Sequence, residues 1–333
     1  MIVFVTLSLV KYKIGFTQTF APGVIVQRLL QLSFFCFFIL SWYRVYSFDL
    51  DVVYGNDDRL DIVNSHDAKI KKMSKSVMAQ IYETKYEELD SGGIKVYAQT
   101  LAERNVCSRE KFSNDPMLAS CTGFLIGPKK LLTAGHCLTS ENACDYQRWV
   151  LDFVRDDNGN LPDTFEKDKV FKCTRVLKKV KDPAQNIDYA VVELDRAVTD
   201  REPLSLRNKG KVAQDDVFTV IGFPNGTPMK ISVGAEVLDN SNKPFFTINS
   251  DTFSGNSGSP VINNRTYQVE GILVRGEDDF AFNPDLGCNE YHRLPQKPSA
   301  KYLGEYVTRS TSMQFYFGSS FGKKILNPES QDF

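Results

Sequence analysis

Three short segments of the sequence contain residues that could together activate a serine nucleophile. The first, Leu131–Cys137, reads LLTAGHC and presents His136 after an apolar run and small residues. Histidine ionises near neutral pH, which suits it to act as a general base. A lone histidine in a loop is usually an ordinary polar residue. The small residues before His136 and the cysteine after it favour the catalytic interpretation.

The second segment, Asn186–Leu194, reads NIDYAVVEL and places Asp188 at the entrance to an apolar run. A carboxylate beside an imidazole would fix its tautomer and stabilise the imidazolium that forms during reaction. Taken alone, this pattern is also typical of an aspartate that simply precedes a strand.

The third segment, Asp251–Pro260, reads DTFSGNSGSP and contains Ser257. A serine hydroxyl is a poor nucleophile until a base removes its proton. The glycines around it would let backbone N–H groups converge on one point, where they could stabilise an oxyanion. A phosphate-binding loop would need a lysine in the pattern G-x-x-x-x-G-K-[ST], which is absent here. An α/β-hydrolase would need G-x-S-x-G and the order serine, acid, histidine, whereas this chain has the order histidine, acid, serine.

Composition excludes several other classes of protein. The 333 residues carry a formal net charge of −1, with 42% hydrophobic and 24% charged residues. This balance permits a packed core and gives no electrostatic footprint for nucleic acid or an anionic membrane. The chemistry outlined above needs side chains, backbone amides and water, so we expect no cofactor.

The cysteines indicate an oxidising compartment. Of seven cysteines, Cys36 lies in an apolar N-terminal stretch, and the other six form an even set compatible with three disulfides. A zinc site would favour close pairs such as C-x-x-C, which do not occur, and the chain has only three histidines. We therefore expect no metal.

Residues 1–50 read as a leader. The run Leu29–Leu40 has about the length of a signal-peptide apolar core and is short for a membrane-spanning helix. We expect a secreted or periplasmic protein. The leader lacks a clean small-x-small cleavage site, so an uncleaved membrane anchor stays open as the alternative.

Short apolar runs separated by turn residues dominate the chain from Ser91 onward. Their length and β-branched content favour strands, in a sandwich or a barrel. The runs are Phe124–Ile126, Trp149–Val154, Val170–Val180, Tyr189–Leu194, Val217–Gly222, Ile231–Val237, Phe245–Ile248, Pro260–Ile262 and Val269–Val274. Before them, the apolar residues of Ser74–Leu89 fall near helical spacing and predict a short amphipathic helix.

The motifs TAGHC and GNSGSP, with DYAVVEL between them, resemble the chymotrypsin/trypsin family of serine endopeptidases, in particular its bacterial branch similar to glutamyl endopeptidases. The resemblance implies an all-β fold, a chymotrypsin-like double β-barrel with a short N-terminal helical extension, and a protein or peptide substrate. We expect a leader at 1–50, an extension with a possible propeptide at 51–92, the first barrel at 93–200, the second at 201–310 and a tail at 311–333.

The resemblance also implies a role for each motif residue. Ser257 would attack the peptide carbonyl, His136 would shuttle the proton and Asp188 would orient His136, while the N–H groups of Gly255 and Ser257 would form the oxyanion hole. Asn256 departs from the aspartate of animal trypsins, which puts trypsin-style zymogen activation in doubt. A protease-fold binding protein without catalysis is therefore the alternative function.

The resemblance further implies a disulfide between Cys121 and Cys137, beside the catalytic histidine. Three pairings are then possible for the other four cysteines, and we favour Cys144–Cys173 with Cys107–Cys288.

The resemblance implies that Asp251 and Thr252 belong to the family's substrate-binding pocket. Asp251 at its base would attract arginine or lysine. It could instead hydrogen-bond its own loop or pair with Arg275. Leu273 stands where glutamyl endopeptidases have a histidine, so glutamyl specificity is disfavoured.

Overall fold

The computed structural model describes residues 53–140, 142–276, 278–298 and 303–313. The predicted leader with Cys36, and all but three residues of the predicted tail, lie outside these residues. Within the described ranges, no helix has the length and apolar character needed to cross a membrane.

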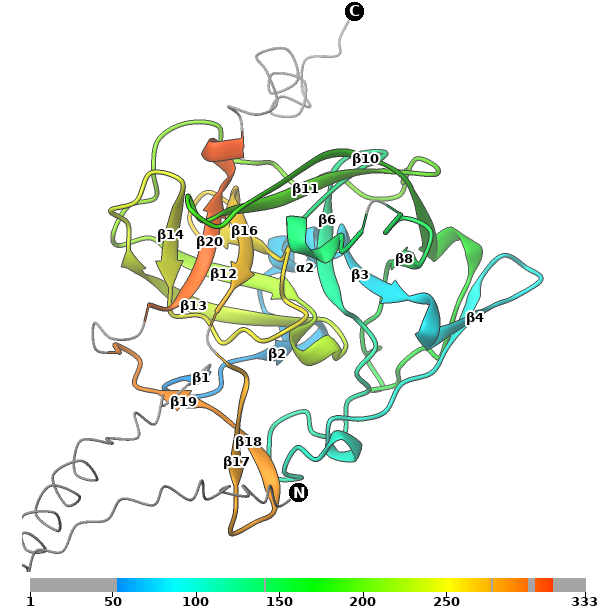
Figure 1. The fold of residues 1–333 in the computed structure, drawn as a ribbon, viewed down its shortest axis with the longest axis horizontal. Coiled ribbons are helices and arrows are strands. Elements are labelled where there is room, and N and C mark those ends of the chain that lie inside the picture. The colour runs from blue at the N-terminus through cyan, green and yellow to red at the C-terminus, as the bar shows by residue number, and fades with distance from the viewer. Residues whose placement is uncertain (1–52, 141, 277, 299–302, 314–333) are drawn as a thin grey trace, which may run out of the picture. The chain divides into compact units, whose positions relative to one another are not determined.

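Six antiparallel strands close into the first barrel, in the order β10-β11-β7-β6-β3-β8 (Figure 1). The strands are β3 (Val77–Tyr82), β6 (Cys121–Gly127), β7 (Lys130–Thr133), β8 (Gln147–Val150), β10 (Val170–Asp182) and β11 (Ile187–Leu194). Successive side chains of β11 point to opposite faces of the strand, and both faces are apolar. Tyr189 and Val191 pack in one apolar cluster, while Ala190 and Val192 pack in another on the opposite face.

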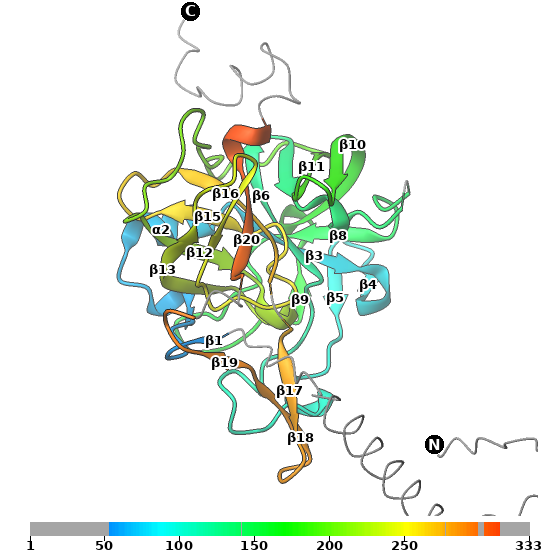
Figure 2. The same ribbon diagram turned by 60° about the vertical axis from the view of Figure 1, so that its left-hand side comes forward.

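A second barrel follows along the chain, with strand order β12-β15-β16-β20-β14-β13 and closure through the β12–β13 pairing. Its strands are β12 (Val217–Gly222), β13 (Lys230–Asp239), β14 (Phe245–Ile248), β15 (Pro260–Asn263), β16 (Val269–Arg275) and β20 (Glu305–Arg309). Figure 2 shows β20 crossing in front of β12, β15 and β16. The two closed barrels confirm the predicted double β-barrel.

The remaining elements are short. The strands are β1 (Val53–Tyr54), β2 (Leu60–Asp61), β4 (Tyr86–Glu88), β5 (Ile94–Val96), β9 (Thr164–Phe165), β17 (Phe280–Asn283), β18 (Cys288–Tyr291) and β19 (Arg293–Leu294). The helices are α2 (Ala68–Ser74) and the 3-10 turns η1 (Ile62–Asn64), η2 (Glu83–Lys85), η3 (Ala102–Arg104), η4 (Gly135–Cys137), η5 (Lys167–Lys169) and η6 (Pro224–Gly226).

The helix predicted over Ser74–Leu89 is wrong. The described helix, α2, ends at Ser74, and the predicted segment contains strand β3 of the first barrel. Val77 and Ile81 pack in one apolar cluster and Met78 in the other, so β3 is buried on both faces. A strand buried on both faces loses its alternating pattern, and its apolar residues can then match helical spacing.

The expected N-terminal extension at 51–92 is also not separate from the barrels. Strand β2 pairs with β13 of the second barrel, and β3 closes the first barrel before the expected boundary at residue 93. Strand β1 pairs in parallel with β19, a late strand of the chain.

Three disulfides join the six described cysteines as Cys107–Cys288, Cys121–Cys137 and Cys144–Cys173. These are the pairings that the sequence analysis favoured.

Candidate active site

His136 lies in the 3-10 turn η4, directly after strand β7. Gly135 permits this turn because a Cβ at that position would lie 2.5 Å from the carbonyl oxygen of Val180 and 2.7 Å from Oδ1 of Asp188. The Cys121–Cys137 disulfide ties the same turn to the start of β6. The histidine is therefore held on a rigid support, with 30% of its side chain exposed.

Asp188 orients His136 through two hydrogen bonds. Its Oδ2 lies 2.7 Å from the His136 Nδ1, and its Oδ1 accepts the His136 backbone N–H at 3.0 Å. The carboxylate is 16% exposed, at the second residue of strand β11. A carboxylate at Nδ1 favours the tautomer that carries its proton there, which leaves Nε2 free to accept a proton.

Ser257 lies on a loop of the second barrel, between β14 and β15. Gly255 and Gly258 flank it with φ of 92° and 90°, a backbone region that glycine adopts without strain. Thr122 of β6 holds the loop from the first barrel. Its hydroxyl donates to the Gly255 carbonyl at 2.8 Å, and its N–H donates to the Ser257 carbonyl at 2.9 Å.

The N–H groups of Gly255 and Ser257 belong to this same loop. Within the described part of the chain, neither donates to a protein acceptor, although the N–H groups of Ser254, Asn256 and Gly258 do. A Cβ on Gly255 would lie 2.4 Å from the carbonyl oxygen of Phe223, so only glycine fits here. Both N–H groups are therefore available as donors to a bound molecule.

A hollow of about 290 Å³ brings residues of both barrels together. Its lining consists of His136, Thr252, Phe253, Ser254, Ser257, Leu273, Val274, Arg275, Gly276, Asp278, Asp279 and Glu305. Among the described residues, no hydrogen bond joins the hydroxyl of Ser257 to His136. Such bonds are often long before substrate binds and tighten in the reacting complex.

Carboxylates dominate the charge of this hollow. Glu305 is 2% exposed, and the carboxylate of Asp279 accepts the Ser254 N–H at 3.0 and 3.1 Å. Burial raises the pKa of Asp279, although its hydrogen bonds from Ser254 oppose the shift. The Arg275 guanidinium bonds Oδ1 of Asn186 and lies 4.2 Å from the Tyr306 ring centroid.

Comparison with known proteins identifies this part of the chain. Residues 121–272 match the trypsin-like peptidase domain family. Over these residues, the chain is similar to trypsin-like peptidases. The segments with His136, Asp188 and Ser257 all lie within the match. A peptidase domain implies protein or peptide substrates, and the three disulfides indicate an extracellular or periplasmic location.

Solved structures of peptidases are similar to this chain at low identity. A Glu endopeptidase, solved in complex with MPD, has 18% identity and a TM-score of 0.45, and the alignment covers 80% of this chain and 97% of that chain. The VesB protease of Vibrio cholerae has 12% identity and a TM-score of 0.45, with 78% and 66% covered. No curated protein matches the sequence.

The structure places the side chain of Asp251 away from the hollow and against the segment 53–58. Thr252 lines the hollow, but Asp251 does not. Asp251 is 2% exposed and accepts the N–H groups of Tyr54 at 2.7 Å and Asp58 at 2.9 Å. The alternative interpretation was a hydrogen bond to its own loop or a pair with Arg275. The side chain forms neither of these and bonds instead to the segment 53–58.

Residues 53–61 are packed against the loop that leads to Ser257. Arg59 is 1% exposed, its guanidinium pairs with Asp57, and it lies 4.1 Å from the ring centroid of Phe253 and 4.5 Å from that of Tyr291. Phe253 lies in the loop that leads to Ser257. The sequence analysis missed this support because cation–π contacts between distant segments leave no local pattern.

Asn256, the departure from animal trypsins, is buried and accepts a hydrogen bond from the Ser259 hydroxyl at 3.3 Å. Because the Asn256 side chain is uncharged, it does not need an N-terminal ammonium group as a partner, unlike the aspartate of animal trypsins.

Among the residues that the structure describes, one cluster has the composition of a metal site, namely Cys121, His136 and Cys137. The two sulfur atoms are bonded to each other in a disulfide, so they cannot act as thiolate ligands.

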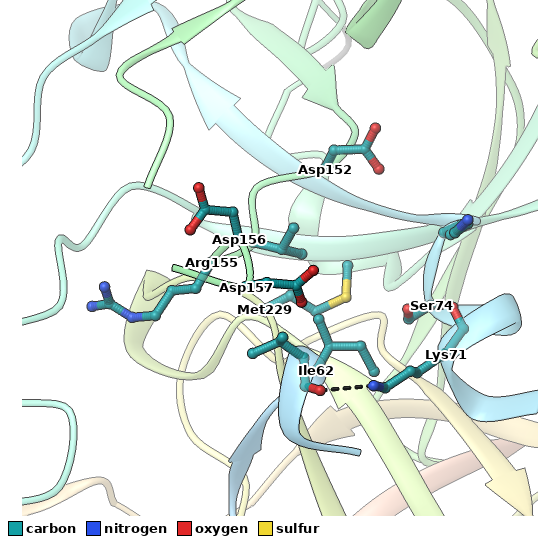
Figure 3. Close-up of a pocket in the computed structure, with 11 residues that line it drawn as sticks. Ile62, Lys71, Ser74, Asp152, Arg155, Asp156, Asp157 and Met229 are labelled. Carbon is teal, nitrogen blue, oxygen red and sulfur yellow. Dashed lines mark hydrogen bonds between the residues drawn. The ribbon is translucent and has the colours of Figure 1, made fainter. Parts of the chain in front are cut away.

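A second hollow, of about 320 Å³, is lined by residues from 62–75, 152–157 and Met229 (Figure 3). Asp152, Asp156 and Asp157 line it together with Lys71 and Arg155, and Lys71 Nζ donates to the Val63 carbonyl at 2.7 Å. The residues that line it include no histidine.

Proposed function

We propose that this peptidase is a secreted serine endopeptidase with His136, Asp188 and Ser257 as its catalytic triad. The observation that carries the proposal is the 2.7 Å contact between His136 Nδ1 and Asp188 Oδ2, with His136 and Ser257 lining one hollow.

Acylation would begin when the Ser257 Oγ attacks the carbonyl carbon of the scissile peptide bond and His136 takes the hydroxyl proton. The N–H groups of Gly255 and Ser257 would stabilise the oxyanion, and Asp188 would stabilise the imidazolium. His136 would then give its proton to the leaving amine as the C–N bond breaks, which leaves an acyl-enzyme.

Deacylation would repeat these steps with water as the nucleophile. His136 would take a proton from water as the oxygen attacks the acyl carbon, and would return it to Ser257 when the ester bond breaks. The products are a carboxylic acid and the free enzyme, so the cycle needs no cofactor.

Covalent labelling by a fluorophosphonate probe tests the proposal. We expect labelling of the wild-type protein at Ser257 and none in Ser257→Ala. Ser254→Ala is the matched control, because Ser254 lines the same hollow, and it should be labelled. Equal labelling of wild type and Ser257→Ala would refute the triad. A wild type that takes no label would favour the alternative of a binding protein without catalysis.

Export is tested separately, because the leader lies outside the described residues. N-terminal sequencing of the exported protein should find a mature terminus before Val53, since β1 and residues 54–61 are bonded into the domain. A mature protein that begins after Arg59 would contradict this expectation.

A further inference from the structure

We propose that Asp279 is a positioning residue for the reaction: its carboxylate holds the backbone of Ser254, so that the N–H of the next residue, Gly255, is presented to the developing oxyanion. The inference rests on the proposed function and adds a residue that acts through the loop rather than on the substrate. It follows from the two bonds that hold Ser254, the planarity of the peptide group and the packing that places Asp279.

Two hydrogen-bonded groups hold the backbone of Ser254. Its N–H donates to both carboxylate oxygens of Asp279, at 3.1 and 3.0 Å, and its carbonyl accepts the Asn225 N–H at 2.5 Å. Asp279 lies in the chain between β16 and β17, and Asn225 lies in the turn η6. The side chain of Ser254 is exposed, so these bonds rather than burial of the side chain hold the residue.

The Asn225 bond sets the direction of the Gly255 N–H. In a trans peptide group the C=O and the following N–H point in opposite directions. The Ser254 carbonyl points to η6, and none of the described residues of η6 lines the hollow, whereas Ser254 and Ser257 line it. The Gly255 N–H therefore points away from η6, as a donor to a molecule in the hollow must.

Glycine itself does not hold this peptide group in place. Gly255 has φ of 92°, and its lack of a Cβ leaves other orientations of the preceding peptide group accessible. A flip would break the bond to Asn225 and put the Ser254 carbonyl oxygen, an acceptor, where the N–H now lies. Asp279 opposes the flip because it anchors Ser254 at a position from which the carbonyl reaches Asn225.

Apolar packing places Asp279 beside Ser254. Phe253 and Phe280, the chain neighbours of the two bonded residues, both pack against Tyr291, whose ring centroid lies 4.8 Å and 5.6 Å from theirs. The three rings belong to one apolar cluster. This cluster keeps the two segments together, so we expect loss of the carboxylate to remove the bond to Ser254 without separating them.

Asp278 provides a matched comparison. It lines the same hollow and carries the same charge, but its carboxylate forms no hydrogen bond with the described loop that contains Ser254. A variant at this position changes the charge of the hollow and leaves the backbone of Ser254 held.

The test compares two inhibitors built on the peptide sequence that the wild type cleaves best. With a peptide aldehyde, the Ser257 Oγ forms a bond to the carbonyl carbon, the hydroxyl proton passes to His136 and the C=O π bond breaks to leave an oxyanion. The matching peptide alcohol cannot be attacked. The alcohol Ki divided by the aldehyde Ki therefore measures how well the protein stabilises the tetrahedral adduct.

Asp279→Ala should lower this ratio by about 10²-fold, a loss of the order found when one oxyanion donor is removed. It should also lower kcat rather than raise KM. Asp279→Asn should lower the ratio by about tenfold, since the amide oxygen can still accept the Ser254 N–H but carries no charge. Asp278→Asn should keep the wild-type ratio.

Three results would overturn the inference. These are an unchanged ratio in Asp279→Ala, an equal loss in Asp278→Asn, or a higher KM at constant kcat in Asp279→Ala, which would make Asp279 a substrate-binding group. If a fluorophosphonate labels Ser257 of the wild type and one of these results is found, only this inference fails. If Ser257 takes no label, the proposed function fails and this inference fails with it.

Thermal unfolding shows whether the variants are folded. If Asp279→Ala has no cooperative transition, Asp279→Asn decides the test, because it keeps the size of the side chain and one acceptor oxygen. A wild-type ratio in Asp279→Asn, with Ser257 labelled, would then refute a role for the carboxylate.

Discussion

At the residue scale, the contact between Asp188 and His136 has the strongest geometric support. The carboxylate bonds both the ring and the backbone N–H of the histidine, so it sets the tautomer and the position of the imidazole together. The backbone N–H of Asp188 donates in turn to the Thr308 hydroxyl at 3.2 Å, which connects the acid to strand β20 of the second barrel.

We predict that Asp188→Asn lowers kcat for peptide cleavage by about 10⁴-fold, because an amide can hold the ring in the wrong tautomer and cannot stabilise the imidazolium. Glu193→Gln is the control on the same strand. Its carboxylate pairs with Arg175 at the surface, so its kcat should stay within about threefold of wild type. Similar losses in the two variants would argue against the triad.

The sequence predicted the site residues that lie in short local motifs. It did not predict contacts between segments that are far apart in the chain. His136, Asp188 and Ser257 each lie in a short recognisable segment, and the structure brings these segments to one site. The position of Asp251, six residues before Ser257, suggested a role in the substrate pocket. The hydrogen bonds from Tyr54 and Asp58, nearly 200 residues away, could not be read from that offset. Glu305 has no motif around it and enters the hollow only through the pairing of β20 with β16.

At the element scale, the segment 53–61 and the loop before Ser257 share a pair of acids, of which Asp251 is buried and Asp58 is half-buried. The Asp58 carboxyl lies against Asp251. Burial and then the charge of Asp251 raise the pKa of Asp58 from its ordinary value of 3.8 to about 8. Burial also raises the pKa of Asp251, although the N–H groups of Tyr54 and Asp58 oppose that shift. The pair therefore holds a proton at neutral pH.

We predict that this pair makes stability fall as pH rises from about 4 to about 8. Over that range the folded protein keeps a proton on Asp58 that the unfolded chain releases, so a higher pH favours unfolding. Asp58→Asn cannot ionise and should remove this contribution. The Tm of the variant minus that of wild type should increase up to about pH 8 and then level off. A difference that is constant with pH would contradict the shared proton.

The strands of the two barrels show which elements can be predicted from a local sequence pattern. Runs such as Tyr189–Leu194 and Val217–Gly222 are bounded by turn residues and were predicted as strands. Strand β3 was mistaken for a helix because both of its faces are buried, which removes the alternation that distinguishes a strand. Whether a run has one or two covered faces depends on contacts with distant strands, which a local window does not contain.

At the scale of the whole molecule, each barrel forms hydrogen bonds to the part of the other barrel that contributes to the site. Thr122 of the first barrel is fully buried, and its hydroxyl donates to the Gly255 carbonyl and accepts the Phe223 N–H at 3.3 Å. Thr308 of the second barrel accepts the N–H of Asp188. The relative placement of Ser257 and His136 is therefore fixed by bonds between the barrels.

We predict that Thr122→Val lowers the free energy of unfolding by about 1–3 kcal/mol, because it leaves buried backbone groups without a partner. It should also slow fluorophosphonate labelling of Ser257, since the loop with the oxyanion donors loses its anchor. Thr219→Val is the matched control, because this buried hydroxyl donates to Asn264 at 2.9 Å and does not line the hollow. Its labelling rate should match wild type. Labelling that slows equally in both variants would show that the effect comes from general destabilisation.

The parallel pairing of β1 with β19 has a consequence for the newly made protein. A ribosome releases residues in chain order, so Val53 and Tyr54 emerge long before Arg293 and Leu294, with which they pair. At about 5–20 residues per second, the earliest strand waits roughly ten seconds or more for its neighbour. Glu305 emerges later still. Nascent chains thus lack both the completed β1–β19 pairing and the part of the hollow that Glu305 lines, so we expect no peptidase activity before the last strands have been made.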